Sequence, residues 1–157
     1  MSGTFSGRWW SFNALPAARL HALLKLRQDV FVVEQECAFA EIDGRDPDAL
    51  HYLLWDEKTD ALAGALRLFA SPGGSLAARI GRVVVSSGHR NLGLGRMLMG
   101  EGMAKARQTR PNCAIDLSAQ AHLEAFYTSL GFMTVSEPYL EDGIPHIDMR
   151  STVQLGR

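Results

Sequence analysis

The sequence predicts a mixed α/β (α+β) fold, in which a mostly antiparallel central sheet is flanked by helices on both faces. Short apolar and β-branched runs alternate along the chain with longer stretches of helical periodicity. Runs that are separated only by a tight turn indicate antiparallel hairpins. Other runs are joined through a helical stretch, which indicates crossover connections that lay helices on the sheet.

Length and composition fit a globular protein with one domain spanning 1–157. A chain of 157 residues can bury about 70% of its unfolded surface, so its core needs no disulfides or metals. Hydrophobic residues make up 46% of the chain and charged residues 21%, as is usual in soluble proteins. The net charge of −1, without a long basic run, gives no support for a nucleic-acid partner.

We expect no membrane span and a cytoplasmic location. No apolar stretch approaches the length of a transmembrane helix, and the N-terminal ten residues lack the basic start and apolar core of a secretion signal. Cys37 and Cys113 stand far apart and in no zinc spacing, so we expect two reduced core residues, with a single bridge left open. The histidines show no metal-binding motif, and we expect no metal.

The elements expected in the first half are a strand at 8–12, a helix from 16 to 30 or beyond, and strands at 51–56 and 61–70. Asn13 can cap the helix and Pro16 lies in its first turn, while leucines recur at helical spacing. Residues 32–40 carry no clear pattern. The segment 41–48 (EIDGRDPD) is turn-rich and acidic, and a solvated connection is one interpretation of it.

The rest of the chain is organised around residues 80–106 (IGRVVVSSGHRNLGLGRMLMGEGMAKA). A β-branched strand at 80–85 is followed by a glycine-rich turn at 86–95 and then by a helix. Small or apolar residues recur in this helix at i, i+3, i+4, i+7, i+8 and i+11, which predicts one buried stripe. Its members are Gly95, Leu98, Met99, Gly102, Met103 and Ala106.

The turn before this helix is a candidate anion site. Glycines allow a ligand close to the backbone, and the first N–H groups of a helix lack partners and carry partial positive charge. Arg90 and Arg96 flank the turn and can bind a phosphate, most simply the pyrophosphate of a nucleotide cofactor. A structural turn without a ligand is the alternative. Leu98 breaks a dinucleotide-binding GxGxxG, and a Walker A loop is missing.

In the last third we expect a strand at 113–118, a helix at 120–130, and strands at 132–137 and 146–153 around a turn at 140–145. Arg110-Pro111 ends the preceding helix, and Gly131 suits the position just after the end of the second one.

Two motifs in this order resemble the GNAT family of N-acetyltransferases. Arg90-x-x-Gly93-x-Gly95 is similar to the family's acetyl-CoA loop, and Tyr127-x-x-x-Gly131-Phe132 is similar to its later helix motif. Further stretches resemble the ElaA group of the family, namely RQDVFVVEQ at 27–35, EIDG at 41–44, GRVVVS at 81–86, AQAHL at 119–123 and EDGIPHI at 141–147. The resemblance implies a GNAT fold, acetyl-CoA as co-substrate, and acetyl transfer to a small-molecule or protein amine.

The resemblance also implies roles for individual residues. The backbone of Val83, Val84 and Val85 would pair with the pantetheine arm of the cofactor like an added strand. Tyr127 would protonate the departing thiolate, and Gln120 stands where many family members carry an asparagine near the cofactor. The pyrophosphate would be held by the loop residues Arg90, Asn91, Leu92, Gly93, Leu94, Gly95 and Arg96.

The chemistry requires a neutral amine, a donor for the oxyanion and an acid for the thiolate. The backbone N–H of Val85 or a neighbour can serve as the donor, and a phenol with a pKa near 10 is protonated at neutral pH. The strand at 80–85 has no acidic residue, so the general base stays open. The candidate bases are Glu34, His51, Glu36, His122 and His146.

Two properties stay open at this stage. The acidic residues of 34–48 would favour a cationic amine if they line the acceptor site. An acyl-CoA-binding sensor of the same fold with little turnover is the alternative function, and the chain can be a monomer or a homodimer.

Overall fold

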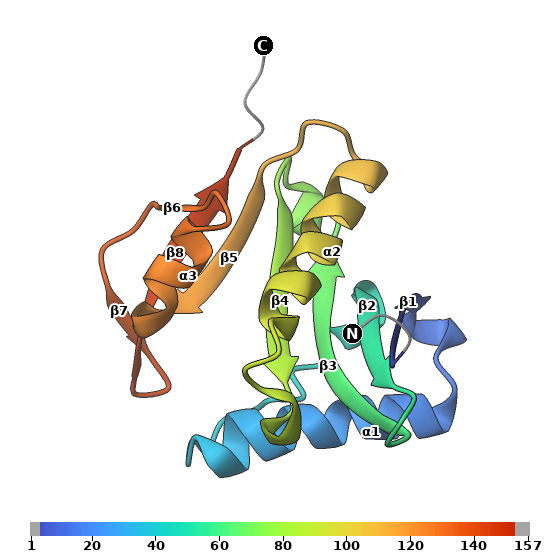
Figure 1. The fold of residues 1–157 in the computed structure, drawn as a ribbon. Coiled ribbons are helices and arrows are strands. Elements are labelled where there is room, and N and C mark those ends of the chain that lie inside the picture. The colour runs from blue at the N-terminus through green and yellow to red at the C-terminus, as the bar shows by residue number, and fades with distance from the viewer. Residues whose placement is uncertain (1–3, 153–157) are drawn as a thin grey trace.

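The computed structural model describes residues 4–152, and all eight strands within them form one sheet in the order β1-β2-β3-β4-β5-β8-β6, with β7 paired to β8 (Figure 1). The strands are β1 Phe5–Ser11, β2 Leu50–Asp56, β3 Ala61–Phe69, β4 Ala78–Val85, β5 Ile115–Gln120, β6 Met133–Thr134, β7 Tyr139–Glu141 and β8 Ile144–Ser151. The α-helices are α1 Ala17–Arg27, α2 Leu94–Thr109 and α3 Glu124–Thr128.

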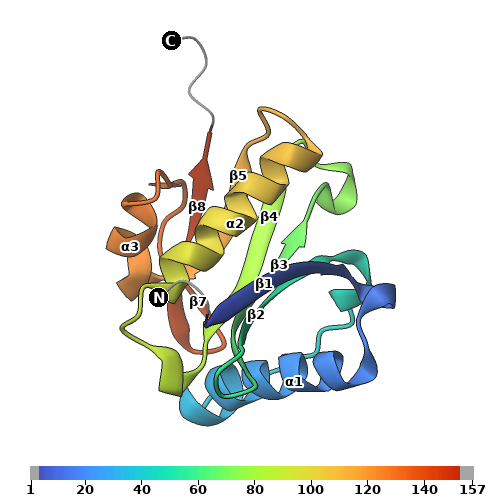
Figure 2. The same cartoon turned by 45° about the vertical axis from the view of Figure 1, so that its right-hand side comes forward.

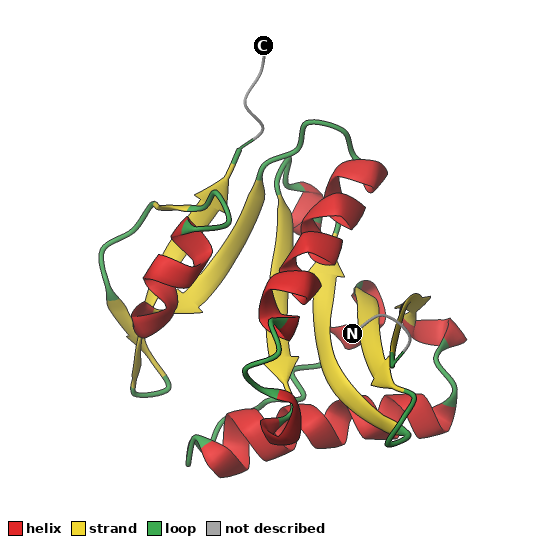
Figure 3. Ribbon diagram, viewed as in Figure 1, coloured by secondary structure: helices red, strands yellow, loops and turns green. Residues whose placement is uncertain are grey.

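The sheet is mixed and mostly antiparallel, as predicted. The pair β4–β5 is parallel, whereas the other strand pairs of the described residues are antiparallel. The chain crosses from β4 to β5 through α2, because neighbouring parallel strands need a long connection. Figure 3 shows the sheet between α2 on one side and α1 on the other, so helices cover both faces.

Alternation along the strands supplies two cores, one on each face of the sheet. Leu54 of β2 packs into the core beneath α2 and α3, while its neighbour Leu53 packs against α1. Successive residues of a strand point to opposite faces, which explains why β2 and β3 are apolar almost throughout. Figure 2 shows α1 and α2 on their separate faces.

The predicted stripe of α2 is confirmed. Leu98 and Met99 are fully buried, Ala106 and Gly102 are buried with them, and Gly95 and Met103 lie at its edges. Gly102 allows close packing, since a Cβ atom there would lie 3.0 Å from Ile80 Cδ1. The helix therefore lies tightly on β3 and β4.

Several boundaries differ from the sequence-based expectations. The expected helix at 120–130 is shorter, because β5 pairs with β8 through Gln120 and α3 begins at Glu124. The expected strand at 132–137 forms only as Met133–Thr134, and part of the expected turn at 140–145 is β7. Helix α1 continues as the π-helix Gln28–Glu34, through part of the unassigned segment. The expected end of the last strand, Val153, lies outside the described residues.

The interpretation of 41–48 as a solvated loop is wrong for its key carboxylates. Glu41 and Asp46 are 6% and 4% exposed, because both pair with the buried guanidinium of Arg27. Arg67 of β3 pairs with Asp43 and Asp46. The partners are distant in sequence, so composition and local pattern carried no sign of them.

Cys37 and Cys113 are both buried and free, as expected of core residues. Among residues 4–152, the structure has no helix that is long and apolar enough to cross a membrane.

Candidate active site

The sheet splits open between β4 and β5. The two strands pair only where Ala78 meets Ile115 and Arg79 meets Asp116, and beyond these residues they diverge (Figure 1). Within the described part of the chain, residues 83–85 therefore have no strand partner on the β5 side. Their free backbone groups form an open edge inside the sheet, which can accept an extended ligand as an added strand.

A β-bulge lies at the start of this open edge. Ala65 lies opposite Val84 across the β3–β4 pair, and Arg67 lies opposite Gly81. Over this length β4 therefore contains one residue more than β3. The bulge contains Arg82, whose φ is +51°. Bulges bend a strand and re-aim its side chains, and they are frequent near active sites.

The bulge reverses which face each β4 side chain meets. Ile80 packs into the core beneath α2, whereas Val84, four residues later, packs against α1. Without the extra residue, both would lie on the same face. Val83 and Val85 consequently turn toward the α2 side, where both are partly buried.

The turn after β4 delivers a free helix N-terminus to this edge. Gly93 precedes α2 with a φ of +75°, in the left-handed region that glycine adopts without strain. No side chain caps the helix, so the N–H groups of its first turn are free to bind an anion. Gly95 lies against α3, since a Cβ atom there would be 3.6 Å from Phe126 Cζ.

The two arginines that flank the start of α2, Arg90 and Arg96, have exposed side-chain partners. Arg90 pairs with Glu34 at 2.8 Å, and these two side chains are 40% and 43% exposed. Arg96 donates a hydrogen bond of 2.8 Å to Ser129 Oγ after α3. Exposed pairs of this kind contribute little to stability, so either guanidinium can turn to a phosphate at small cost.

Tyr127 of α3 is the buried acid candidate. Its ring makes edge contacts with Phe126 and Phe132 and is 8% exposed. Burial raises the pKa of the phenol to about 12, which keeps it protonated. No hydrogen bond within the described residues occupies its hydroxyl, so the proton is available for transfer.

Gln120 and Glu34 approach the split from its two sides. Gln120, at the end of β5, donates a hydrogen bond of 3.2 Å to Gln35 Oε1, next to Glu34. Glu34 in turn holds Arg90 of the turn before α2. These contacts bring the end of the π-helix, the turn and the end of β5 together.

The structure does not place His51 at the split between β4 and β5. Its selection as a candidate base is therefore wrong. His51 is fully buried on β2, two strands away from the split, and its Nε2 lies 2.9 Å from the Asp46 carbonyl. Burial lowers the pKa of the imidazole. A general base must reach the proton that it removes, so we drop His51 from the candidates.

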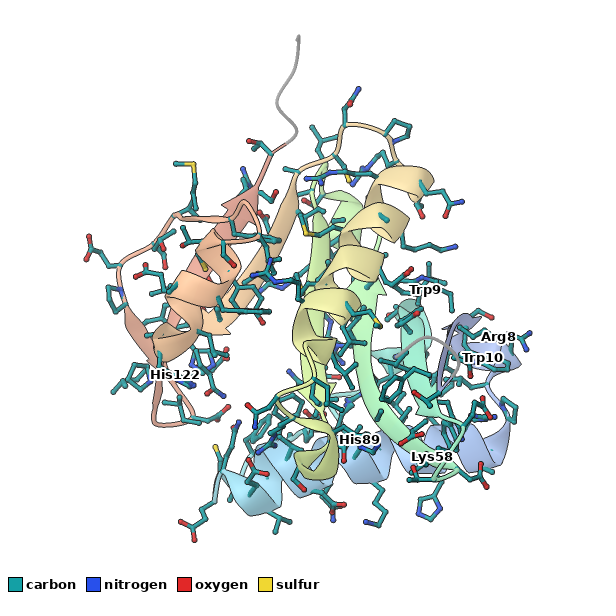
Figure 4. All side chains as sticks on the ribbon, in the orientation of Figure 1. Arg8, Trp9, Trp10, Lys58, His89 and His122 are labelled. Carbon is teal, nitrogen blue, oxygen red and sulfur yellow. The ribbon has the colours of Figure 1, made fainter. Side chains whose placement is uncertain are left out.

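The other candidate bases lie in different settings, and His146 of β8 is the one opposite Gln120. Glu36 and His122 are exposed, and His146 Nδ1 lies 2.7 Å from the Ile144 carbonyl. Figure 4 labels His122, beyond β5, and His89, in the turn after β4.

His89, in the turn after β4, makes contacts that the sequence did not reveal. Its Nε2 lies 2.8 Å from Asp56 Oδ2, and its Nδ1 lies 3.2 Å from Ser86 Oγ. The hydrogen bond to His89 lowers the pKa of Asp56 to about 2. This contact fastens the turn to the end of β2, 33 residues earlier, a separation that no local motif encodes.

A separate hollow of about 270 Å³ lies between β1, β2 and the start of α2, and its lining is mostly apolar. Its lining includes Phe5, Tyr52, Leu92, Leu94 and Met97.

An open strand edge, a glycine-led helix N-terminus and a buried tyrosine are features of an acyl-CoA-dependent acyltransferase. Residues 25–153 match the model of the Acetyltransferase (GNAT) domain, and the chain belongs to this family. The family resemblance and the GNAT fold expected from the sequence are thereby confirmed. The protein is accordingly an enzyme of the GNAT N-acyltransferase type.

Individual relatives agree with this assignment. Protein ElaA of Escherichia coli is 43% identical over 143 residues, which is 90% of this chain and 92% of that protein. The crystal structure of an acyl-CoA N-acyltransferase from Pseudomonas aeruginosa superposes with a TM-score of 0.89 at 41% identity, over 94% of this chain and 99% of the other. The crystal structure of Escherichia coli ElaA superposes with a TM-score of 0.86 at 39% identity and the same coverage.

Proposed function

We propose that the protein transfers an acetyl group from acetyl-CoA to a primary amine, of a small molecule or of a protein. The observation that carries the proposal is the open edge of β4, which lies directly before the free N-terminus of α2. The pantetheine arm would pair with residues 83–85, and the pyrophosphate would lie on the amides of 90–96. These two subsites are consecutive in the chain, as the two parts of the cofactor require.

The reaction proceeds by direct attack. The amine nitrogen forms a bond to the thioester carbonyl carbon, and the resulting oxyanion accepts a hydrogen bond from the N–H of Val85 or a neighbour. The C–S bond then breaks, and the thiolate takes the phenolic proton of Tyr127. The amine nitrogen loses one proton to a base or to water, and Tyr127 regains a proton from solvent, so one amide and one free CoA thiol are formed.

Glu34 is the candidate base that we retain. Its carboxylate reaches the cofactor turn through Arg90, and an approaching pyrophosphate competes for that same guanidinium. A carboxylate released in this way can accept a proton from the amine, directly or through water. The carboxylates of Glu41, Asp43 and Asp46 are held by arginines, so they do not supply a free negative patch for a cationic acceptor.

Thermal unfolding with and without acetyl-CoA tests the cofactor assignment. Saturation at 100 times Kd stabilises the fold by about 2.7 kcal/mol. Each kcal/mol raises Tm by about 2–4 °C in a chain of this size. The Gly93→Glu variant should lose the shift, because it places a carboxylate beside the pyrophosphate at a φ of +75°. Gly73→Glu is the matched control, since Gly73 has a φ of +59° in a distant turn.

An amine panel then separates the enzyme from the sensor. Release of free CoA thiol is followed with acetyl-CoA, lysine, polyamines and N-terminal peptides as acceptors. Turnover with any of them, lost in Gly93→Glu, supports the transferase. A large thermal shift without turnover across the panel would favour the acyl-CoA sensor, and no shift at millimolar acetyl-CoA would reject both.

A further inference from the structure

We infer that Arg82 is a positioning residue, whose ion pairs with Glu41 and Asp43 hold the β4 bulge and thereby aim the backbone of residues 83–85 at the thioester. The inference rests on the proposed function and adds to it the residue that holds the backbone of 83–85 in position. Arg82 itself has no need to touch the substrate.

The backbone of Arg82 needs something to hold it. Its φ of +51° lies in the left-handed region that side chains other than glycine rarely adopt. Among the described residues it is the one non-glycine residue with such a φ inside a strand, since the others lie in turns. A strained conformation persists where the surroundings over-determine it, and such residues gather at functional sites.

The side chain of Arg82 supplies that restraint. Its Nε lies 2.7 Å from Glu41 Oε1, and its Nη2 lies 3.5 Å from Asp43 Oδ2. The Nη2 group also donates a hydrogen bond of 3.3 Å to the Glu41 carbonyl. These two ion pairs and one hydrogen bond attach the bulge residue to a segment outside its own strand.

Glu41 and Asp43, the partners of Arg82, are themselves held by two other arginines. Glu41 also accepts hydrogen bonds of 3.0 and 2.6 Å from Arg27 of α1, and Asp43 accepts bonds of 3.0 and 2.6 Å from Arg67 of β3. Asp46 joins Arg27 to Arg67. Three guanidiniums thus face three carboxylates, and their formal charges balance within a cluster that is buried at Arg27, Glu41, Asp46 and Arg67 and partly exposed at Arg82 and Asp43.

Any movement of Arg82 unbalances this cluster. A buried carboxylate that loses its partner is costly, so the cluster resists displacement of the guanidinium and of the bulge behind it. The open edge begins within the bulge, since Arg82 and Val83 together lie opposite Leu66 of β3. A change in the bulge therefore rotates the backbone groups of 83–85 relative to the split, while the turn and α2 keep their own supports in His89 and Ser129.

The carbonyl carbon of acetyl-CoA provides a readout that does not depend on the acceptor. Acetyl-CoA labelled with ¹³C at the thioester carbonyl is titrated into the protein, and the carbonyl resonance is recorded by NMR. A hydrogen bond from the β4 backbone moves this resonance downfield of free acetyl-CoA. Binding of CoA without an acetyl group is measured in parallel by calorimetry.

Three variants separate the possible causes. Arg82→Gly removes the anchor but leaves a residue that adopts positive φ without strain. Asp43→Asn removes one partner charge at a side chain that is 23% exposed, which keeps the test possible if the glycine variant does not fold. Arg150→Gln is the matched control, because it breaks a partly exposed strand-to-strand pair with Asp116 at the closed end of the split, away from residues 83–85.

We expect Arg82→Gly and Asp43→Asn to move the bound carbonyl resonance toward that of free acetyl-CoA. The affinity for acetyl-CoA relative to CoA should fall about threefold to tenfold, the effect of one weakened hydrogen bond. Affinity for CoA itself should fall by less than the affinity for acetyl-CoA, because residues 83–85 would contact only part of the CoA molecule. The resonance in Arg150→Gln should stay unchanged. A wild-type carbonyl resonance in Arg82→Gly, with Asp43→Asn also unchanged, would overturn the inference.

Other outcomes distinguish this inference from the proposed function. If the wild-type protein binds acetyl-CoA but leaves the carbonyl at its free position, the positioning role is rejected while cofactor binding stands. If neither acetyl-CoA nor CoA binds the wild-type protein, the proposed function fails, and the positioning role fails with it.

Discussion

Among single residues, Tyr127 has the environment best suited to one chemical step. Its phenol lies between aromatic rings, and burial raises its pKa to about 12. Since the raised pKa favours the neutral form, the proton stays bound at every pH below about 12 and is lost only as the pH rises through that value. Deprotonation of Tyr127 therefore cannot limit turnover between pH 6 and pH 10.

Tyr127→Phe should lower kcat by about 100-fold to 10,000-fold, the usual contribution of a general acid. Acetyl-CoA affinity should stay near that of the wild-type protein, because the ring and its packing remain. Steady-state turnover and calorimetric titration measure the two quantities. Full turnover in the phenylalanine variant would show that another group protonates the thiolate. If kcat of the wild-type protein falls between neutral and alkaline pH, and this fall is absent in Tyr127→Phe, the raised pKa of Tyr127 would be contradicted.

Single residues also mark where prediction from sequence ends. Tyr127 and Arg90 were found because they stand in short motifs at fixed spacing. His89 and Asp56 were missed because their contact depends on how β2 and the turn after β4 meet in space. His51 was chosen for its residue type, yet the fold buries it completely.

Among the elements, α2 follows the glycine-rich turn after β4 and packs on the sheet, and two of its glycines have opposite surroundings. A Cβ atom on Gly102 would lie 3.0 Å from Ile80 Cδ1 and 3.1 Å from Leu66 Cδ2, whereas nothing lies within 4 Å of one on Gly100. Gly102 therefore serves packing, and Gly100 only weakens the helix.

Gly102→Val should destabilise the protein by about 1–3 kcal/mol, because it overpacks the contact between α2 and the sheet. Gly100→Ala should stabilise it by about 0.5–1 kcal/mol, because alanine restricts the unfolded chain and favours helix. Urea unfolding of both variants measures the difference. Equal effects of the two substitutions would contradict the close approach at Gly102.

Elements with a strong local period were predictable, and those fixed by pairing were not. The stripe of α2 follows from sequence alone because one helix face is buried along its whole length. The end of β5 and the start of α3 depend on β8, whose His146 pairs with Gln120. The acidic segment 41–48 looked solvated because its arginine partners lie 14 to 41 residues away.

Considered as a whole, the molecule joins α1, the 41–48 segment, β3 and β4 through one cluster of buried charges. Arg27 is 1% exposed and holds both Glu41 and Asp46. The same helix and its π-helical continuation carry an exposed pair, Lys25 with Asp29, whose side chains are 67% and 46% exposed. One helical stretch therefore offers a buried and an exposed ion pair for comparison.

Arg27→Met should destabilise the fold by about 3–5 kcal/mol, since it takes from each of two buried carboxylates one of its two guanidinium partners. Lys25→Met should cost at most about 0.5 kcal/mol, as expected of an exposed pair one helical turn apart. Denaturant unfolding at neutral pH measures both values. A loss below about 1 kcal/mol in Arg27→Met would mean that the cluster relaxes or hydrates, against its closed geometry.

Amide hydrogen exchange with and without acetyl-CoA is the measurement that bears on the cofactor site as a whole. We expect acetyl-CoA to slow exchange at the amides of 83–85 that face the split and at those of 93–96, with Gly93→Glu abolishing both effects. Exchange around Phe5 and Tyr52, at the separate hollow, should be unchanged. Protection confined to that hollow, or no protection at 83–85 under saturating acetyl-CoA, would contradict a cofactor site in the split between β4 and β5.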